Sequence, residues 1–248
     1  MARPQGETMP PLSARSVALS LLLGATPPRL AAADLGRLAA HFGLAPATMR
    51  VALSRMVAAG ELDANDGVYA LSARHLARRE TTEAGIHPEP AAYTGTWRMI
   101  VATGGGRPAD ERQATRAALE RGRFAPLREG VWMRPGNLGE PAPIPGDALL
   151  AFSVVPDDDQ ALAGRLWDLD AWAEKARTLL EVLHGPEGPM TRLTAAAAAV
   201  RHLAADPVLP AELEPADWPA ARLRRSYAAY RDELAAIAAT ASTPETKD

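Results

Sequence analysis

Two short helical patterns separated by a tight turn restrict the fold of this chain more than any other feature. In "LGRLAAHFGLAPATMRVALSRMVAAGEL" (residues 35–62), apolar side chains recur at helical spacing on both sides of "FGL". The positions that share a face are Leu35, Leu38 and Ala39 before the turn, and Met49, Leu53, Met56 and Val57 after it. Pro46 suits the first turn of the second helix, and Gly60 ends it. Each helix must bury its apolar stripe, so the pattern predicts a compact helix-turn-helix.

The flanking sequence adds a helix before this pair and two strands after it. Ser13 is placed to cap a helix over "ARSVALSLLLG" (residues 14–24), and Asp34 is placed to cap the next one. In "ELDANDGVYALS" (residues 61–72), "NDG" separates two short stretches with apolar residues, which predicts a β-hairpin with a primed turn. Helix, helix, turn, helix and hairpin is the element order of a winged helix-turn-helix.

The outward face of the third helix has the composition of a DNA recognition helix. A period of about 3.6 residues turns these side chains away from the apolar stripe: Ala47, Arg50, Val51, Ser54 and part of Arg55. Thr48, Arg50 and Ser54 offer donors to base edges, and Ala47 and Val51 offer small apolar contacts. Arg55 lies further along and would meet phosphate. The alternative is a solvated face of a helical hairpin, where arginines are ordinary.

The charge distribution favours DNA binding by the first third of the chain. The net charge is −3, but residues 1–80 hold nine arginines and six carboxylates, a balance of +3, and the remainder carries −6. At the tip of the expected hairpin, Asp63 and Asp66 would repel phosphate. Asn65 and the backbone would therefore be the best contacts of the hairpin.

The composition excludes several classes of protein. The chain has no cysteine, which excludes disulfides and thiolate metal sites. Hydrophobic residues make up 47% and charged residues 23%, as in a soluble globular protein. The first apolar run, "VALSLLLGA", lacks a suitable basic leader and is too short to span a bilayer. We therefore expect a cytoplasmic protein with no membrane association.

Beyond the N-terminal patterns, the chain first mixes strands with a helix and then becomes helical. "HPEPAAYTG" (residues 87–95) is a predicted linker. After it, "TWRMIVAT", "GVWMRP" and "ALLAFSVVP" are predicted strands, the last of them buried, and "ADERQATRAALERG" is a predicted helix. From Asp157 onward the pattern is helical, and the tail "STPETKD" is expected to be disordered.

These patterns predict an α+β multidomain protein. We expect a winged helix-turn-helix DNA-binding domain over residues 1–85 and a ferredoxin-like α+β domain over residues 86–160. A helical C-terminal domain would occupy residues 161–248.

Separated motifs relate the chain to a known family. "TWRMIV" (residues 96–101), "FAPLREGVWMRP" (124–135), "RLWDLDAW" (165–172) and "DPVLPAELEPADWPAARLRRSY" (206–227) follow "SARSVALSLLLG" and "FGLAPATMRVALSRMVAAGEL". With these motifs in this order, the chain resembles the PaaX family of bacterial transcriptional regulators, the phenylacetate-degradation repressors and their relatives.

The resemblance implies winged-helix, central ferredoxin-like and C-terminal helical domains in a homodimer that represses an operon. It also implies release of the double-stranded operator DNA when an aryl-CoA thioester such as phenylacetyl-CoA binds. The basic recognition positions of the family fall on Arg50 and Arg55, and Val51 stands where a threonine is common. The operator of this protein is therefore expected to differ from those of relatives.

An acyl-CoA effector would need arginines for its phosphates and an apolar slot for its acyl group. The candidate residues for such a site are Arg98, Arg128, Trp132 and Arg134, with Trp97 nearby. The alternative is that the tryptophans of this part of the chain are core and domain-interface packing: Trp97, Trp132, Trp167 and Trp172.

Enzyme functions find less support in the sequence. Gly104, Gly106 and Ala109 form a G-x-G-x-x-A pattern, but Pro108 withholds one N–H and no acid is placed for a ribose, so a Gly-rich connection is preferred. The five histidines lack ligand spacing, and Asp157–Asp159 begins a helix, where carboxylates favour the macrodipole. We expect no catalytic residue, metal or cofactor. The alternative is a small-molecule or nucleotide-binding enzyme whose N-terminal helices serve dimerisation.

Overall fold

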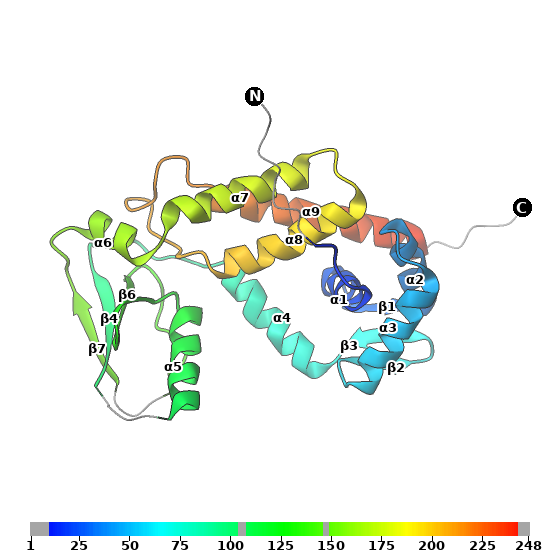
Figure 1. Ribbon diagram of the computed structural model, residues 1–248, viewed down its shortest axis with the longest axis horizontal. Coiled ribbons are helices and arrows are strands. Elements are labelled where there is room, and N and C mark those ends of the chain that lie inside the picture. Colours follow the sequence, from blue (N-terminus) through cyan, green and yellow to red (C-terminus); the bar gives the residue numbers. More distant parts are fainter. Residues whose placement is uncertain (1–9, 104–107, 146–148, 243–248) are drawn as a thin grey trace, which may run out of the picture. The chain divides into compact units, whose positions relative to one another are not determined.

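The computed structural model describes residues 10–103, 108–145 and 149–242 of the chain, which has α+β architecture with helices and two antiparallel sheets (Figure 1). The chain divides into two compact units. The first comprises Met1–Glu83, Arg177–Val200 and Arg222–Asp248, and the second comprises Ala84–Ala176 and Arg201–Ala221. The division falls inside helices α4 (Ala73–Ile86), α7 (Leu169–His184), α8 (Pro189–Ala204) and α9 (Ala220–Ser242).

The N-terminal part of the first unit has three helices and a three-stranded sheet. Its elements are α1 (Ala14–Gly24), β1 (Arg29–Ala31), α2 (Ala32–His41), α3 (Pro46–Ala58), β2 (Leu62–Asn65) and β3 (Val68–Leu71). The sheet order is β1-β3-β2, and all pairs are antiparallel. Asp66 and Gly67 join β2 to β3 with φ angles of 46° and 75°, as a primed turn requires. The predicted hairpin is confirmed, and the three-residue β1 is an addition to it.

Helix starts in this region depend on both side chains and strand pairing. The Ser13 hydroxyl accepts a hydrogen bond from the Ser16 N–H at 3.2 Å, so the predicted cap of α1 is confirmed. The predicted cap at Asp34 is wrong, because α2 begins at Ala32 and Asp34 lies in its first turn, paired with Arg37. Strand β1 leads directly into α2, and the Ala32 N–H donates to the Gly67 carbonyl at 2.8 Å. The hairpin thus satisfies one of the donors at the helix start that have no partner within the helix.

The core of this region is built from the inward faces of α1, α2 and α3. The buried apolar residues are Val17, Leu21, Leu22, Leu35, Leu38, Phe42, Met49, Leu53, Met56, Leu62 and Leu71. Removing each such side chain from water contributes roughly 1.5–3 kcal/mol of transfer free energy, so this packing holds α3 in place.

Polar contacts attach the later helices of the first unit to one another. Arg192 of α8 forms a bidentate ion pair with Glu233 of α9, both N···O distances being 2.7 Å. Arg231 of α9 binds Glu83 of α4 at 2.8 and 2.9 Å. Helix α4 has the polar sequence "ARHLARRETTEAGI", and no helix was predicted for this segment.

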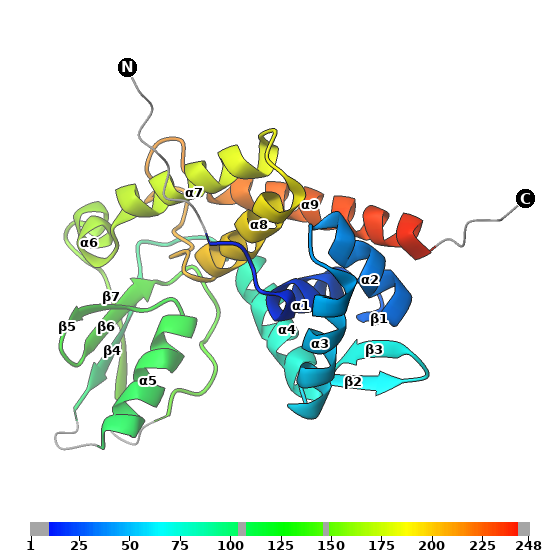
Figure 2. The same ribbon diagram turned by 45° about the vertical axis from the view of Figure 1, so that its right-hand side comes forward.

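The second unit contains a four-stranded antiparallel sheet with helices on its faces. Its elements are β4 (Trp97–Ala102), α5 (Ala109–Arg121), β5 (Ala125–Arg128), β6 (Val131–Pro135), β7 (Leu149–Val154) and α6 (Asp159–Leu166). The strand order is β5-β6-β4-β7. Helix α5 lies along one face of the sheet (Figure 2), where Leu119 and Phe124 pack on Ile100 and Trp132. On the other face, Trp97 and Met133 pack with Ala163 of α6 and with Leu209 and Leu213.

The prediction that the third strand is buried is wrong. Leu150 of β7 is 51% exposed and Phe152 is 42% exposed. Among the strands that the structure describes, β7 pairs only with β4 and forms the edge of the sheet, so its apolar run has a neighbouring strand on one side. The aspartates that follow behave as expected, since the Asp158 carboxylate accepts from the Ala161 N–H at 2.9 Å and begins α6.

Some expectations fall outside the described residues. Gly104 and Gly106 of the Gly-rich connection lie there, and so does the tail beyond Ser242, the residue at which α9 ends. Within the described ranges, the structure has no helix with the length and apolarity that a membrane span requires.

Candidate nucleic-acid interface

The turn between α2 and α3 sets the direction of α3. Gly43 has a φ of 72°, and the Leu44 N–H donates to the Ala39 carbonyl at 2.8 Å, which closes the end of α2. Phe42 is only 3% exposed and anchors the turn in the core. Pro46 occupies the first turn of α3, where its missing N–H has no helical partner to lose. The "FGL" segment is therefore a rigid connection.

Helix α3 presents a continuous exposed face. Its inward residues Met49, Leu53 and Met56 are at most 2% exposed. The side chains that face solvent are Ala47, Thr48, Arg50, Val51, Ser54 and Arg55. Val51 is 51% exposed, which is high for a β-branched apolar residue. The predicted inward positions Met49, Leu53 and Met56 are confirmed, whereas Val57, predicted on the same stripe, is only half-buried.

The two arginines of this face have free guanidinium groups. Within the described ranges, neither Arg50 nor Arg55 forms an ion pair or a side-chain hydrogen bond. Their donors are thus available to a partner of negative charge. The nearby Arg15 is different, because it binds Glu61 through two hydrogen bonds of 2.7 and 2.8 Å. The Arg15 guanidinium lowers the pKa of Glu61 and joins the start of α1 to the residue before β2.

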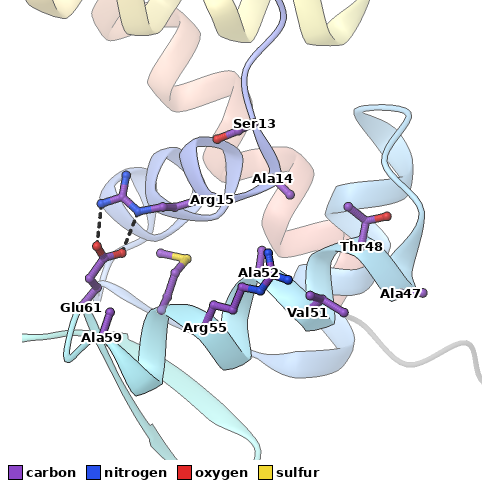
Figure 3. Close-up of a pocket in the computed structure, with 11 residues that line it drawn as sticks. Ser13, Ala14, Arg15, Ala47, Thr48, Val51, Ala52, Arg55, Ala59 and Glu61 are labelled. Carbon is purple, nitrogen blue, oxygen red and sulfur yellow. Dashed lines mark hydrogen bonds and ion pairs between the residues drawn. The ribbon is translucent and has the colours of Figure 1, made fainter.

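A shallow hollow of about 740 Å³ lies between the start of α1 and α3. Figure 3 shows Thr48, Val51 and Arg55 along α3 on one side of it, with Ser13 and Ala14 of the α1 segment opposite. The Arg15–Glu61 ion pair lines one end of this hollow. The small side chains of α3 leave its outer surface slim, which entry into a major groove requires.

The hairpin is less suited to phosphate than α3. Asn65 is exposed and pairs in register with Val68, next to the turn. Asp63 and Asp66 are also exposed, so the tip carries negative charge on both sides of Asn65. Asn65 lies at the tip of the hairpin, as the sequence analysis placed it.

The residues predicted for an effector are only partly brought together. Arg98 and Arg134 are cross-strand neighbours, and Trp132 lies on the same sheet face. Arg134 is 3% exposed, stacks over the Phe124 ring at 4.8 Å and donates to the Gly139 carbonyl at 2.5 Å. Burial lowers the pKa of Arg134 to about 10.

Two other effector candidates also have contacts within the protein. Trp132 is 9% exposed and belongs to the core under α5. Arg98 binds Glu140 at 3.1 Å and the Ser153 hydroxyl at 3.2 Å. Arg128 is exposed on the outer strand β5, where a bulge separates it from the regular pairing with β6. Most of this set therefore already has partners within the protein.

No site for a metal ion can be assembled from the described residues. The described part of the chain holds no group of three or more histidine, cysteine, aspartate or glutamate side chains placed to bind one.

The comparison with family models agrees with the N-terminal motifs of the chain. A family model described as "PaaX-like protein" matches residues 13–75, the region of α1 to β3. Among solved structures, the chain is similar to an uncharacterized protein, Rv0674 from Mycobacterium tuberculosis, with 41% sequence identity and a TM-score of 0.85. The similarity covers 93% of this chain and 99% of the other. Among curated proteins, none matches the chain.

Proposed function

Because the chain belongs to the PaaX-like protein family, we propose that it is a transcriptional regulator, a repressor that binds operator DNA through α3. The observation that carries the proposal is the exposed face of α3, with two unpaired arginines held on a rigidly packed helix. A surface with solvent-facing cations and small side chains has the chemistry that a duplex groove selects.

In this proposal, the elements α1 to β3 form a winged helix-turn-helix. Helix α3 enters the major groove, and Arg50 binds the O6 and N7 atoms of a guanine. Thr48 and Ser54 donate to bases or phosphates, and Arg55 binds phosphate. The smaller side chains, Ala47 and Val51, contact thymine methyl groups, and Asn65 of the hairpin contacts the backbone.

A regulator of this kind works as a homodimer. Two copies of α3 must be held about 34 Å apart to reach successive turns of the major groove on one side of the duplex. An effector can weaken DNA binding if it binds more tightly to a dimer whose two α3 helices have a different separation. The size of the effect is set by the difference in the affinity of the effector for the DNA-binding dimer and for that other dimer. We propose an aryl-CoA thioester as this effector, and a central domain of ferredoxin-like type is in keeping with the strand order β5-β6-β4-β7.

The test first selects the genomic DNA fragments that bind the full chain. A selected fragment is then titrated with the protein, and fluorescence anisotropy measures the affinity at several salt concentrations. The affinity should fall steeply as salt rises, because each phosphate contact releases counterions. An enzyme whose N-terminal helices serve only dimerisation would select no fragment, and that result would refute the proposal.

A further inference from the structure

The second unit contains a hollow of about 600 Å³ to which the proposed DNA contacts assign no role. It lies between the end of α5, the turn into β5, the end of α6 and the segment that leaves α8. Residues from all four segments line it, and all of them belong to the second unit. The hollow is therefore a feature of one compact body.

One arginine fixes the shape of this hollow. Arg123 has a φ of 64°, a left-handed conformation that is unusual for a residue with a side chain. Its guanidinium donates to the carbonyls of Gly85 at 2.6 Å and of Leu203 at 3.4 Å, and also to that of Ala204. These bonds tie the last turn of α8 to the α5–β5 turn. Arg123 therefore has a structural role.

Two further arginines of the hollow have no such partners. Arg121 and Arg201 are exposed, and neither forms an ion pair or side-chain hydrogen bond with any residue that the structure describes. Of the two acids in the lining, Glu120 binds Arg116 at 2.8 Å, and Asp206 is 1% exposed and accepts from the Val208 N–H at 3.0 Å. Positive charge is therefore left over in the hollow.

The remaining lining of the hollow is largely apolar. Trp167 lines the hollow at the end of α6 and packs against Trp97, with the ring centroids 6.3 Å apart. Phe124 and Leu166 also line it. Two unpaired arginines and an indole ring that line one hollow match a ligand that has an anionic group and a flat apolar group.

We propose that this hollow binds an organic anion with a flat apolar group. Arg121 and Arg201 bind the phosphate or carboxylate, and the apolar group lies against Trp167. The inference rests on the proposed function, because it gives the effector of the regulator a site distinct from Arg98, Arg128, Trp132 and Arg134.

Isothermal titration calorimetry of the full chain with phenylacetyl-CoA, CoA and phenylacetate tests this site. If the chain binds CoA but not phenylacetate, the arginines are assigned to phosphate. If it binds phenylacetate but not CoA, they are assigned to carboxylate. The double variant Arg121→Gln/Arg201→Gln should weaken the binding of the same probe by roughly a hundredfold, about tenfold for each lost charge-assisted bond. The matched control, Arg222→Gln, removes another exposed arginine, on α9, and should leave the Kd unchanged.

The outcomes separate this inference from the proposed function. Equal binding of phenylacetyl-CoA by wild type and double variant would overturn the site and leave the effector proposal standing. Wild type that binds DNA but none of the three probes would overturn the site and the effector, and leave the DNA-binding role. Trp167→Phe is a second variant that keeps an aromatic ring. It should weaken binding less than the double variant does, and a larger loss would contradict the primary role of the arginines.

Discussion

The arginines of α3 and those of the sheet in the second unit lie in opposite environments. Arg50 and Arg55 point into solvent and have no partner among the described residues, whereas Arg134 is buried over Phe124 and Arg98 binds Glu140 and Ser153. Since the residue type is the same, the difference lies in what surrounds each guanidinium. A cation whose donors are already used holds the fold, and one whose donors are free is available to a ligand.

The largest expected effect is on stability and belongs to the sheet. Arg134→Ala should lower the free energy of unfolding by roughly 2–4 kcal/mol, because it opens a cavity over Phe124 and leaves the Gly139 carbonyl without its donor. Urea denaturation measures this. Arg128→Ala on the neighbouring strand removes an exposed arginine and should stay within about 0.5 kcal/mol of wild type. Equal effects of the two variants would contradict the contrast.

The next effect is on DNA affinity and belongs to α3. Arg50→Ala should cost roughly 1–3 kcal/mol of specific binding and relax the preference at one base pair. Its stability should be close to that of wild type because the side chain is exposed. Anisotropy titrations with the selected fragment and its single-base variants measure both effects. Unchanged operator affinity would remove Arg50 from the interface, and Arg222→Ala is the control.

Arg55 should behave differently from Arg50 if it binds phosphate. Arg55→Ala should weaken binding to all sequences to a similar extent and reduce the slope of log K against log salt by about 1. The measurement is a salt titration of the variant on specific and unrelated duplexes. A loss confined to one base position would instead assign Arg55 to base recognition.

The smallest effect concerns Arg15, the arginine near α3 that does have a partner. Its guanidinium holds the pKa of Glu61 below the ordinary value of 4.5, so the stabilisation is present above that value and is lost as pH falls through the folded pKa. Glu61→Gln should cost less than about 1 kcal/mol at pH 7, because Arg15 is half exposed. Urea denaturation at several pH values should show the difference from wild type shrinking toward acid pH. A difference in the free energy of unfolding that does not change with pH would mean that the ion pair does not contribute to stability.

Local sequence patterns predicted much of α3. They failed where a structural feature depends on segments that are far away in the sequence. The apolar stripe of Met49, Leu53 and Met56 was readable because a helix repeats at a constant angle. The buried state of β7 was predicted wrongly, because an apolar run does not reveal whether a strand is central or at the edge. The start of α2 was predicted wrongly at Asp34, because the pairing of β1 with β3 leads the chain into the helix three residues after Arg29.

The candidate sites divide in the same way. The outward face of α3 was predictable because all of its residues belong to one helix. The hollow of the second unit was not, because Arg121, Trp167 and Arg201 come from three separate segments. Its one visible signal was Trp167 in the motif "RLWDLDAW", and a tryptophan in a sequence is equally consistent with core or interface packing.

The sequence by itself determined the tight turn between α2 and α3, the primed hairpin turn and most of the side chains that α3 turns outward, since each follows from backbone geometry over a few residues. The tertiary structure alone decided which arginines bind groups within the protein and which have guanidinium groups available to a ligand. That outcome depends on carbonyls, carboxylates and rings that other segments bring within hydrogen-bonding or stacking distance, and short-range periodicity carries no information about them.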